Sequence, residues 1–127
     1  MLSSKILIVD DEKPVSTLMM EVLHREGYPN VEMASDGQEA VEKYKALLPD
    51  LVFMDIEMPV MDGYESCSRI KAFNPLAKIL VLTGNPADSR ARRTVQEGFA
   101  SALLEKPLRL EDVRRIVREN LPVASET

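Results

Sequence analysis

Polar side chains able to do chemistry follow four apolar segments of the sequence. They comprise three carboxylates, one hydroxyl and one ammonium group. In an open sheet of parallel strands, ligands bind beyond the carboxyl ends of the strands. If these segments are such strands, the polar residues share one site: Asp10 and Asp11 after residues 5–9, Asp55 after residues 51–54, Thr83 after residues 78–82, and Lys106 after residues 101–104.

The charges of this set indicate the chemistry. Three carboxylates repel one another unless a cation or shifted pKa values offset their charge. The set contains neither His nor Cys, so it suits Mg²⁺ better than zinc. An Asp carboxylate is a competent nucleophile toward a phosphoryl donor, and phosphoryl transfer needs mainly positioning and neutralised charge. The pattern therefore predicts that an Asp of this set forms an aspartyl phosphate, with Mg²⁺, Lys106 and Thr83 beside it.

The segments that must position these residues alternate between two patterns. Apolar runs at residues 5–9, 51–54 and 78–82 predict strands covered on both faces, and residues 31–34 and 101–104 predict two more strands. Apolar residues at helical spacing predict a helix after each strand. Regular alternation of this kind predicts an α/β fold, with a parallel sheet and right-handed crossovers.

Five helices are expected to bury apolar stripes against this sheet. The helix between residues 86 and 97 has the weakest stripe, with only Ala91 and Val95. Cys67 is predicted to be a core residue and not a redox thiol, His24 an exposed residue near a helix end, and Asp62 a turn or cap residue. The other stripes are Val15, Leu18, Met19, Val22 and Leu23; Ala40, Val41, Tyr44, Leu47 and Leu48; Tyr64, Cys67 and Ile70; and Leu110, Val113, Ile116, Val117 and Leu121.

Composition and charge narrow the class of protein. A chain of 127 residues with 45% hydrophobic and 29% charged residues predicts one globular domain, at residues 4–121, followed by a polar tail or the start of a linker at residues 122–127. A net charge of −5 argues against direct nucleic-acid binding. One cysteine and the lack of a long apolar stretch predict a cytoplasmic protein without membrane insertion.

Arginines are concentrated between residues 84 and 121. Two interpretations remain open: a solvated helix face, which is the usual meaning of such charges, or a docking surface for an acidic partner. The arginines are Arg90, Arg92, Arg93, Arg109, Arg114, Arg115 and Arg118.

The order and spacing of the polar motifs resemble those of response-regulator receiver domains. The resemblance extends from about Lys5 to Leu121 and implies a flavodoxin-like sheet with the strand order 2-1-3-4-5. The motifs that carry it are Asp10-Asp11, the stretch from Asp55 to Gly63 (DIEMPVMDG), Thr83-Gly84 and Lys106-Pro107.

The resemblance also implies a role for each site residue. Asp55 would be the phosphoacceptor, Thr83 would bond a phosphoryl oxygen, and Lys106 would pair with Asp55 or its phosphate. The Mg²⁺ ligands would be Asp55, Asp11 directly, Asp10 mainly through water, and the backbone carbonyl of Glu57. The Lys106–Pro107 bond is typically cis in this family.

Leu103 departs from the family pattern. Receiver domains usually carry Tyr, Phe or His three residues before the lysine, and this ring moves inward on activation. The stretch from Gly98 to Lys106 is also one residue longer than is common. We therefore predict a smaller change at residue 103, by repacking.

The implied function is signalling and not catalysis on a separate substrate. The partners would be a sensor histidine kinase or histidine phosphotransfer protein and a downstream protein, with a homodimer as a further outcome of phosphorylation. The downstream protein would bind the face formed by the helix between residues 86 and 97, the strand at residues 101–104 and the helix with the stripe from Leu110 to Leu121. A phosphorelay intermediate, a phosphate sink, or a receiver excised from a larger regulator or hybrid kinase are alternatives.

Two other function classes share part of the pattern. A phosphotransferase or phosphatase with an Asp nucleophile usually has a second acid two residues later, where Glu57 stands, but its flanking Thr and lid insertions are lacking. A flavin carrier of the same topology needs a Ser/Thr/Gly-rich phosphate loop after the first strand. The acidic Asp10-Asp11-Glu12 stretch would repel that phosphate.

Overall fold

The computed structural model describes residues 3–121, so the tail predicted at residues 122–127 lies outside the described range. The strands form one parallel sheet in the order β2-β1-β3-β4-β5, which confirms the predicted fold and strand order. The elements are β1 (Lys5–Val9), α1 (Lys13–Arg25), β2 (Asn30–Ala34), α2 (Gly37–Leu47), β3 (Leu51–Asp55), α3 (Gly63–Phe73), β4 (Ile79–Thr83), α4 (Ser89–Gln96), β5 (Ala102–Glu105) and α5 (Leu110–Asn120).

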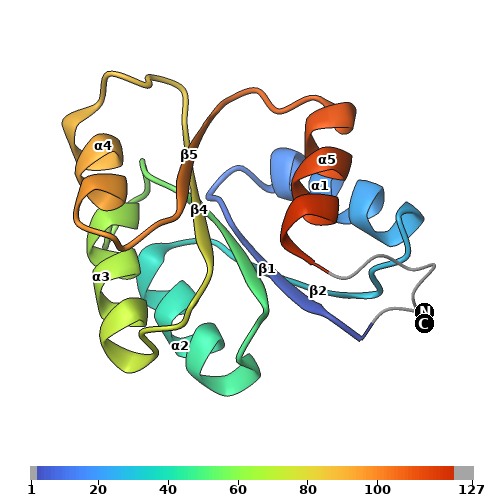
Figure 1. The fold of residues 1–127 in the computed structure, drawn as a ribbon, viewed down its shortest axis with the longest axis horizontal. Helices are drawn as coiled ribbons and strands as arrows, with labels where there is room; N and C mark the ends of the chain where they lie inside the picture. Colours follow the sequence, from blue (N-terminus) through green and yellow to red (C-terminus); the bar gives the residue numbers. More distant parts are fainter. Residues whose placement is uncertain (1–2, 122–127) are drawn as a thin grey trace.

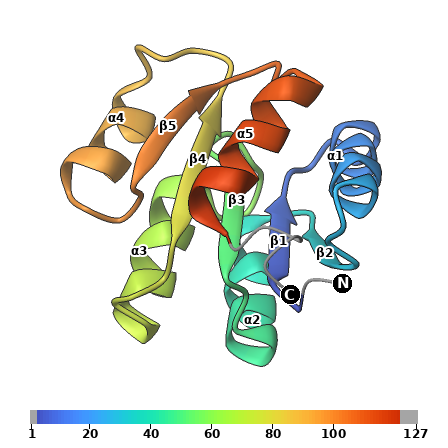
Figure 2. The same cartoon turned by 45° about the vertical axis from the view of Figure 1, so that its right-hand side comes forward.

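Helices cover both faces of the sheet, with α1 and α5 on one side and α2, α3 and α4 on the other (Figures 1 and 2). Successive residues of a strand point to opposite faces, so each central strand supplies both cores. In β1, for example, Leu7 and Val9 pack toward α2 and α3, whereas Ile6 and Ile8 pack toward α1 and α5. Burial on both faces explains why the central strands are continuous apolar runs.

Side-chain caps fix the start of three helices. Asp36 accepts from the backbone N–H of Glu39 at 2.8 Å, and Asp62 accepts from that of Glu65 at 2.9 Å. Asp88 accepts from two N–H groups at the start of α4. The predicted cap role of Asp62 is confirmed, and such a cap contributes about 1 kcal/mol.

Several predicted stripe residues are not buried. Leu18 and Leu48 are 55% and 57% exposed, and Leu110 is 46% exposed. α1 is rotated so that Ser16 is buried and bonds the Lys13 carbonyl, which leaves Leu18 at the solvent edge. Leu48 lies just beyond α2, where its φ of 50° ends the helix.

Other predictions for the helices are met. Cys67 is fully buried, and burial raises the pKa of its thiol, as expected for an unreactive core cysteine. His24 is exposed in the last turn of α1.

No helix within residues 3–121 is both long and apolar enough to cross a membrane.

The arginines of α5 form ion pairs within the chain. Arg114 and Arg118 both reach Glu26, at 2.9 and 3.6 Å. Arg115 lies near Asp112 and Glu119 on its own helix. The Glu26 pairs join α5 to the end of α1, and the exposed pairs of Arg115 contribute little to stability.

Gly63 allows α3 to pack directly on the end of β3. A Cβ atom at residue 63 would lie 2.4 Å from the Asp55 carbonyl oxygen and 2.8 Å from Ile56 Cα. We therefore expect Gly63→Ala to lower the free energy of unfolding by about 1–3 kcal/mol, as overpacking does. Gly84→Ala is the matched control, because a Cβ there meets nothing within 4 Å. Equal denaturation midpoints for the two variants would contradict this account.

Candidate functional site

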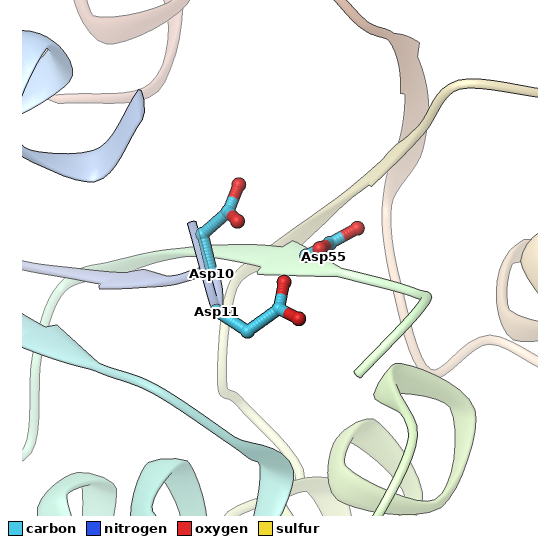
Figure 3. Close-up of side chains that lie close together, drawn as sticks. All are labelled: Asp10, Asp11 and Asp55. Atoms are coloured by element: carbon cyan, nitrogen blue, oxygen red, sulfur yellow. The ribbon is translucent and has the colours of Figure 1, made fainter. Parts of the chain in front are cut away.

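Three carboxylates meet at the carboxyl edge of the sheet. Asp10 and Asp11 follow β1, and Asp55 is the last residue of β3, the neighbouring strand (Figure 3). Each offers an oxygen, and these oxygens all lie within 4.8 Å of one another. Asp10 and Asp55 are buried, whereas Asp11 is exposed. The cluster is thus reached from solvent on the side of Asp11.

Lys106 brings a positive charge into this cluster. Its Nζ atom lies 3.2 Å from Asp10 Oδ2 and 3.4 Å from Asp55 Oδ2. The backbone N–H of Lys106 donates to the Thr83 carbonyl at 2.8 Å, which continues the pairing of β4 with β5. The Lys106–Pro107 bond is cis, as the family resemblance implied.

Asp55 and Lys106 shift each other's pKa. Burial raises the pKa of Asp55 to about 6, and the Asp10 charge adds to this rise, while Lys106 and the Glu57 N–H oppose it. Burial alone would lower the pKa of Lys106, but the charges of Asp55 and Asp10 outweigh burial and raise it. Lys106 therefore stays cationic at neutral pH, beside carboxylates that are costly to ionise together.

Thr83 ends β4 as predicted, and its hydroxyl is engaged within its own loop. Thr83 is fully buried. Its Oγ1 donates to the Asn85 carbonyl and accepts from the Asn85 N–H, both at 3.0 Å. A phosphoryl oxygen on Asp55 would have to compete with Asn85 for this hydroxyl. Threonine often bonds its local backbone in this way, but the sequence does not show which partner it takes.

A groove of about 750 Å³ leads to the cluster. Its polar end is formed by Asp11, Asp55, Glu57 and Lys106. Its remaining wall is mostly apolar and comes from α1, the end of β4 and the segment after β5. Sequence reasoning missed this wall, whose main apolar residues are Pro14, Val15, Leu18, Met19, Leu82, Pro107 and Leu108.

The donor atoms of the cluster fit a hard divalent cation. All are oxygens, the ligands that Mg²⁺ prefers. Asp10 Oδ2 is buried, and its charged partner within residues 3–121 is the Lys106 ammonium, 3.2 Å away. One ammonium group does not neutralise three clustered carboxylates, so a cation held by Asp10, Asp11 and Asp55 would offset their remaining repulsion.

Sequence comparisons identify close relatives across almost the whole chain. The family model described as the response regulator receiver domain matches residues 6–118. The chemotaxis protein CheY of Halobacterium salinarum is 35% identical over 94% of this chain and 98% of its own length. Sporulation initiation phosphotransferase F of Bacillus subtilis is 31% identical over 98% of this chain and 99% of its own length.

Solved structures share both the fold and part of the sequence. CheY in a CheX–CheY–BeF₃–Mg²⁺ complex from Borrelia burgdorferi has a TM-score of 0.83 and 30% identity, over 91% of this chain and 88% of that chain. The response regulator TrrA of Thermotoga maritima, in complex with Mg²⁺ and BeF, has a TM-score of 0.81 and 33% identity, over 93% and 99% of the two chains. The chain belongs to the response regulator receiver domains of two-component signalling.

Proposed function

We propose that this receiver is a phosphorylation-dependent switch in which Asp55 accepts a phosphoryl group from a phosphohistidine. The donor would be a sensor histidine kinase or a histidine phosphotransfer protein. The observation that carries the proposal is the placement of Asp55, buried beside Lys106 Nζ at 3.4 Å and within 4.8 Å of Asp10 and Asp11. Relatives that were solved with Mg²⁺ and beryllofluoride, a phosphoryl mimic, support it.

The transfer itself needs little covalent chemistry from the protein. An Asp55 oxygen attacks phosphorus, the P–N bond of the phosphohistidine breaks, and its electron pair returns to the imidazole, which takes a proton from solvent. Lys106 then pairs with the new negative charge. Asp10, Asp11, Asp55 and the Glu57 carbonyl would hold Mg²⁺, whose charge would stabilise the oxygens of the phosphoryl group during transfer.

The groove beside Asp55 suits the donor protein. Leu18 of α1 is 55% exposed on its wall, and Pro107 and Leu108 lie along it. An exposed apolar wall that leads to a reactive carboxylate fits a helix that presents its phosphohistidine to Asp55. We place this exchange in the cytoplasm, where a lone cysteine stays reduced.

Output would follow from a change of shape on the α4-β5-α5 face, which would bind a downstream protein or a second copy of the chain. A second candidate is a phosphorelay intermediate that passes its phosphoryl group on. The match to sporulation initiation phosphotransferase F over 98% of this chain favours that candidate. In neither case would the chain act on a separate substrate.

A small phosphodonor tests the proposed function without knowledge of the kinase. With acetyl phosphate and Mg²⁺, the intact mass of the protein should rise by one phosphoryl group. Chelation of the metal by EDTA before the donor is added should prevent the rise. A protein that gains no phosphoryl group with Mg²⁺, or gains it equally with EDTA, would contradict the proposal.

Asp11→Asn should abolish the response of the fold to Mg²⁺. A ligand that binds only the folded state raises stability by mass action, so the wild-type melting temperature should increase with Mg²⁺. The variant loses the exposed ligand of the cluster and some of its repulsion, and should melt higher than wild type in EDTA. Glu12→Gln, at the next residue, is the control and should keep the Mg²⁺ response. A full response in Asp11→Asn would place the cation elsewhere.

A further inference from the structure

A cluster of side chains fastens α4 to α3. The Tyr64 hydroxyl of α3 donates to Glu97 Oε1 at 2.7 Å and accepts from an Arg93 N–H at 3.0 Å. Arg93 also donates to Glu97 Oε2 at 3.0 Å. Each of the three side chains thus bonds the other two. We refer to Tyr64, Arg93 and Glu97 as the Tyr64 cluster.

Ring contacts reinforce the Tyr64 cluster. The Arg93 guanidinium lies over the Tyr64 ring, 4.7 Å from its centroid, a cation–π arrangement. Phe99, in the segment before β5, meets the Tyr64 ring edge-on at 5.8 Å. Tyr64 therefore contacts α4 and the approach to β5 together.

A second link connects α4 to the segment that follows Asp55. Arg90 of α4 pairs with Asp62 at 3.4 Å. Asp62 caps α3, and the N–H of Gly63, the next residue, donates to the Ile56 carbonyl at 3.1 Å. Contacts thus continue from residue 56, directly after Asp55, through the start of α3 to α4.

Little else in α4 itself is buried. The helix has eight residues, of which only Ala91 and Thr94 are buried. The Thr94 hydroxyl bonds Arg90 of the same helix. Elements with few buried apolar contacts lie at the low end of local stability, so even these partly exposed polar links to α3 affect where α4 lies.

We propose that the Tyr64 cluster is a latch that holds α4 in its unphosphorylated position and that opens when Asp55 is phosphorylated. This rests on the proposed function. Withdrawal of the Thr83 hydroxyl from Asn85 shifts the loop that precedes α4, and α4 then separates from Tyr64. In this chain the aromatic side chain coupled to α4 thus lies on α3, while residue 103 is a leucine.

Thermodynamic linkage determines whether a variant of the Tyr64 cluster binds a phosphoryl mimic more tightly or more weakly than wild type. If phosphorylation opens the latch, a variant that weakens the latch favours the phosphorylated state by the same factor. Tyr64→Phe keeps the ring and removes only the hydroxyl that joins Arg93 and Glu97. We expect it to bind beryllofluoride, in the presence of Mg²⁺, about two- to tenfold more tightly than wild type, the range for one hydrogen bond.

Tyr44→Phe is the matched control. It also removes one tyrosine hydroxyl, but this hydroxyl accepts from Asn74 at 3.0 Å, between the ends of α2 and α3 and away from α4. Affinities come from amide NMR titrations of the three proteins with beryllofluoride. Without the mimic, hydrogen exchange between residues 89 and 97 should be faster in Tyr64→Phe than in wild type and unchanged in Tyr44→Phe.

Each outcome separates the latch from the proposed function. Tighter binding and faster α4 exchange in Tyr64→Phe alone would support the latch. Wild-type binding with equal or weaker binding by Tyr64→Phe would overturn the latch and leave the proposed function standing. Failure of the wild type to bind beryllofluoride would overturn the proposed function and, with it, the release of the latch on phosphorylation.

Discussion

Asp55→Asn is expected to gain no phosphoryl group from acetyl phosphate and Mg²⁺ under conditions in which the wild type is modified. An amide is a poor nucleophile and cannot form the aspartyl phosphate. Glu57→Gln is the matched control, because it neutralises the acid two residues later and keeps the backbone carbonyl. Intact mass spectrometry measures both. Loss of phosphorylation in Glu57→Gln as well would favour the enzyme class that needs a second acid there.

The same Asp55→Asn variant should be more stable than wild type in the absence of metal. The folded pKa of Asp55 is about 6, above the value of 3.8 for an unperturbed Asp. The folded wild type therefore binds this proton more tightly than the unfolded chain does, and its stability falls as pH rises from about 4 to about 6. Removal of this charge in Asp55→Asn should raise the free energy of unfolding by about 1–3 kcal/mol at pH 7.

The pH dependence separates this effect from a general change in packing. Below about pH 4 the carboxyl group is protonated in both folded and unfolded wild type, so the advantage of Asp55→Asn should disappear there. Urea denaturation in EDTA at pH 3 and pH 7 measures this difference in stability. If Asp55→Asn and wild type differed in stability by the same amount at both pH values, the account of Asp55 as a buried carboxyl group with a raised pKa would be contradicted.

Lys106→Met is the second variant with a large expected effect. The Lys106 ammonium contacts Asp10 and Asp55, whose side chains are 0% and 4% exposed. Removal of one partner from a buried ion pair typically costs about 3–5 kcal/mol, because the other charge is left uncompensated. We expect a loss of that order at pH 7 in EDTA, and a larger stabilisation by Mg²⁺ than in wild type.

An exposed ion pair provides the comparison for Lys106. Arg69→Met removes the partner of Glu65 on the surface of α3, where both side chains are more than half exposed. That loss should stay below about 1 kcal/mol. A Lys106→Met variant as stable as Arg69→Met in urea denaturation would show that the ammonium does not hold the carboxylates together.

The parallel sheet and the edge that carries the site were predictable because they depend on simple patterns, whereas the strand order came from the resemblance to receiver domains. Strands buried on both faces must be apolar throughout, so polar residues can appear only where they end. Asp10, Asp55 and Lys106 are such residues, and the structure brings them within ion-pair distance. Asp10 and Asp55 converge because β1 and β3 pair in parallel, whereas Lys106 reaches both carboxylates from the far side of β4.

Contacts between surface side chains were not predictable in the same way. Leu18 is exposed because Ser16 turns its hydroxyl to the backbone and takes the buried position. Tyr64 was expected to face inward, and its partly buried ring does pack against the core. The sequence did not show that its hydroxyl reaches Glu97 at the end of α4. Helical spacing shows which residues share a face of a helix. It does not show how the helix is rotated about its own axis, and this rotation decides these contacts.

Identification of the modified residue tests the central claim most directly. Wild-type protein treated with acetyl phosphate and Mg²⁺ is reduced with borohydride, which converts an aspartyl phosphate to homoserine, and its peptides are sequenced by mass spectrometry. We predict homoserine at residue 55 and unmodified aspartate at residues 10 and 11. Homoserine at residue 10 or 11, or none in phosphorylated protein, would contradict the assignment of Asp55 as the phosphoacceptor.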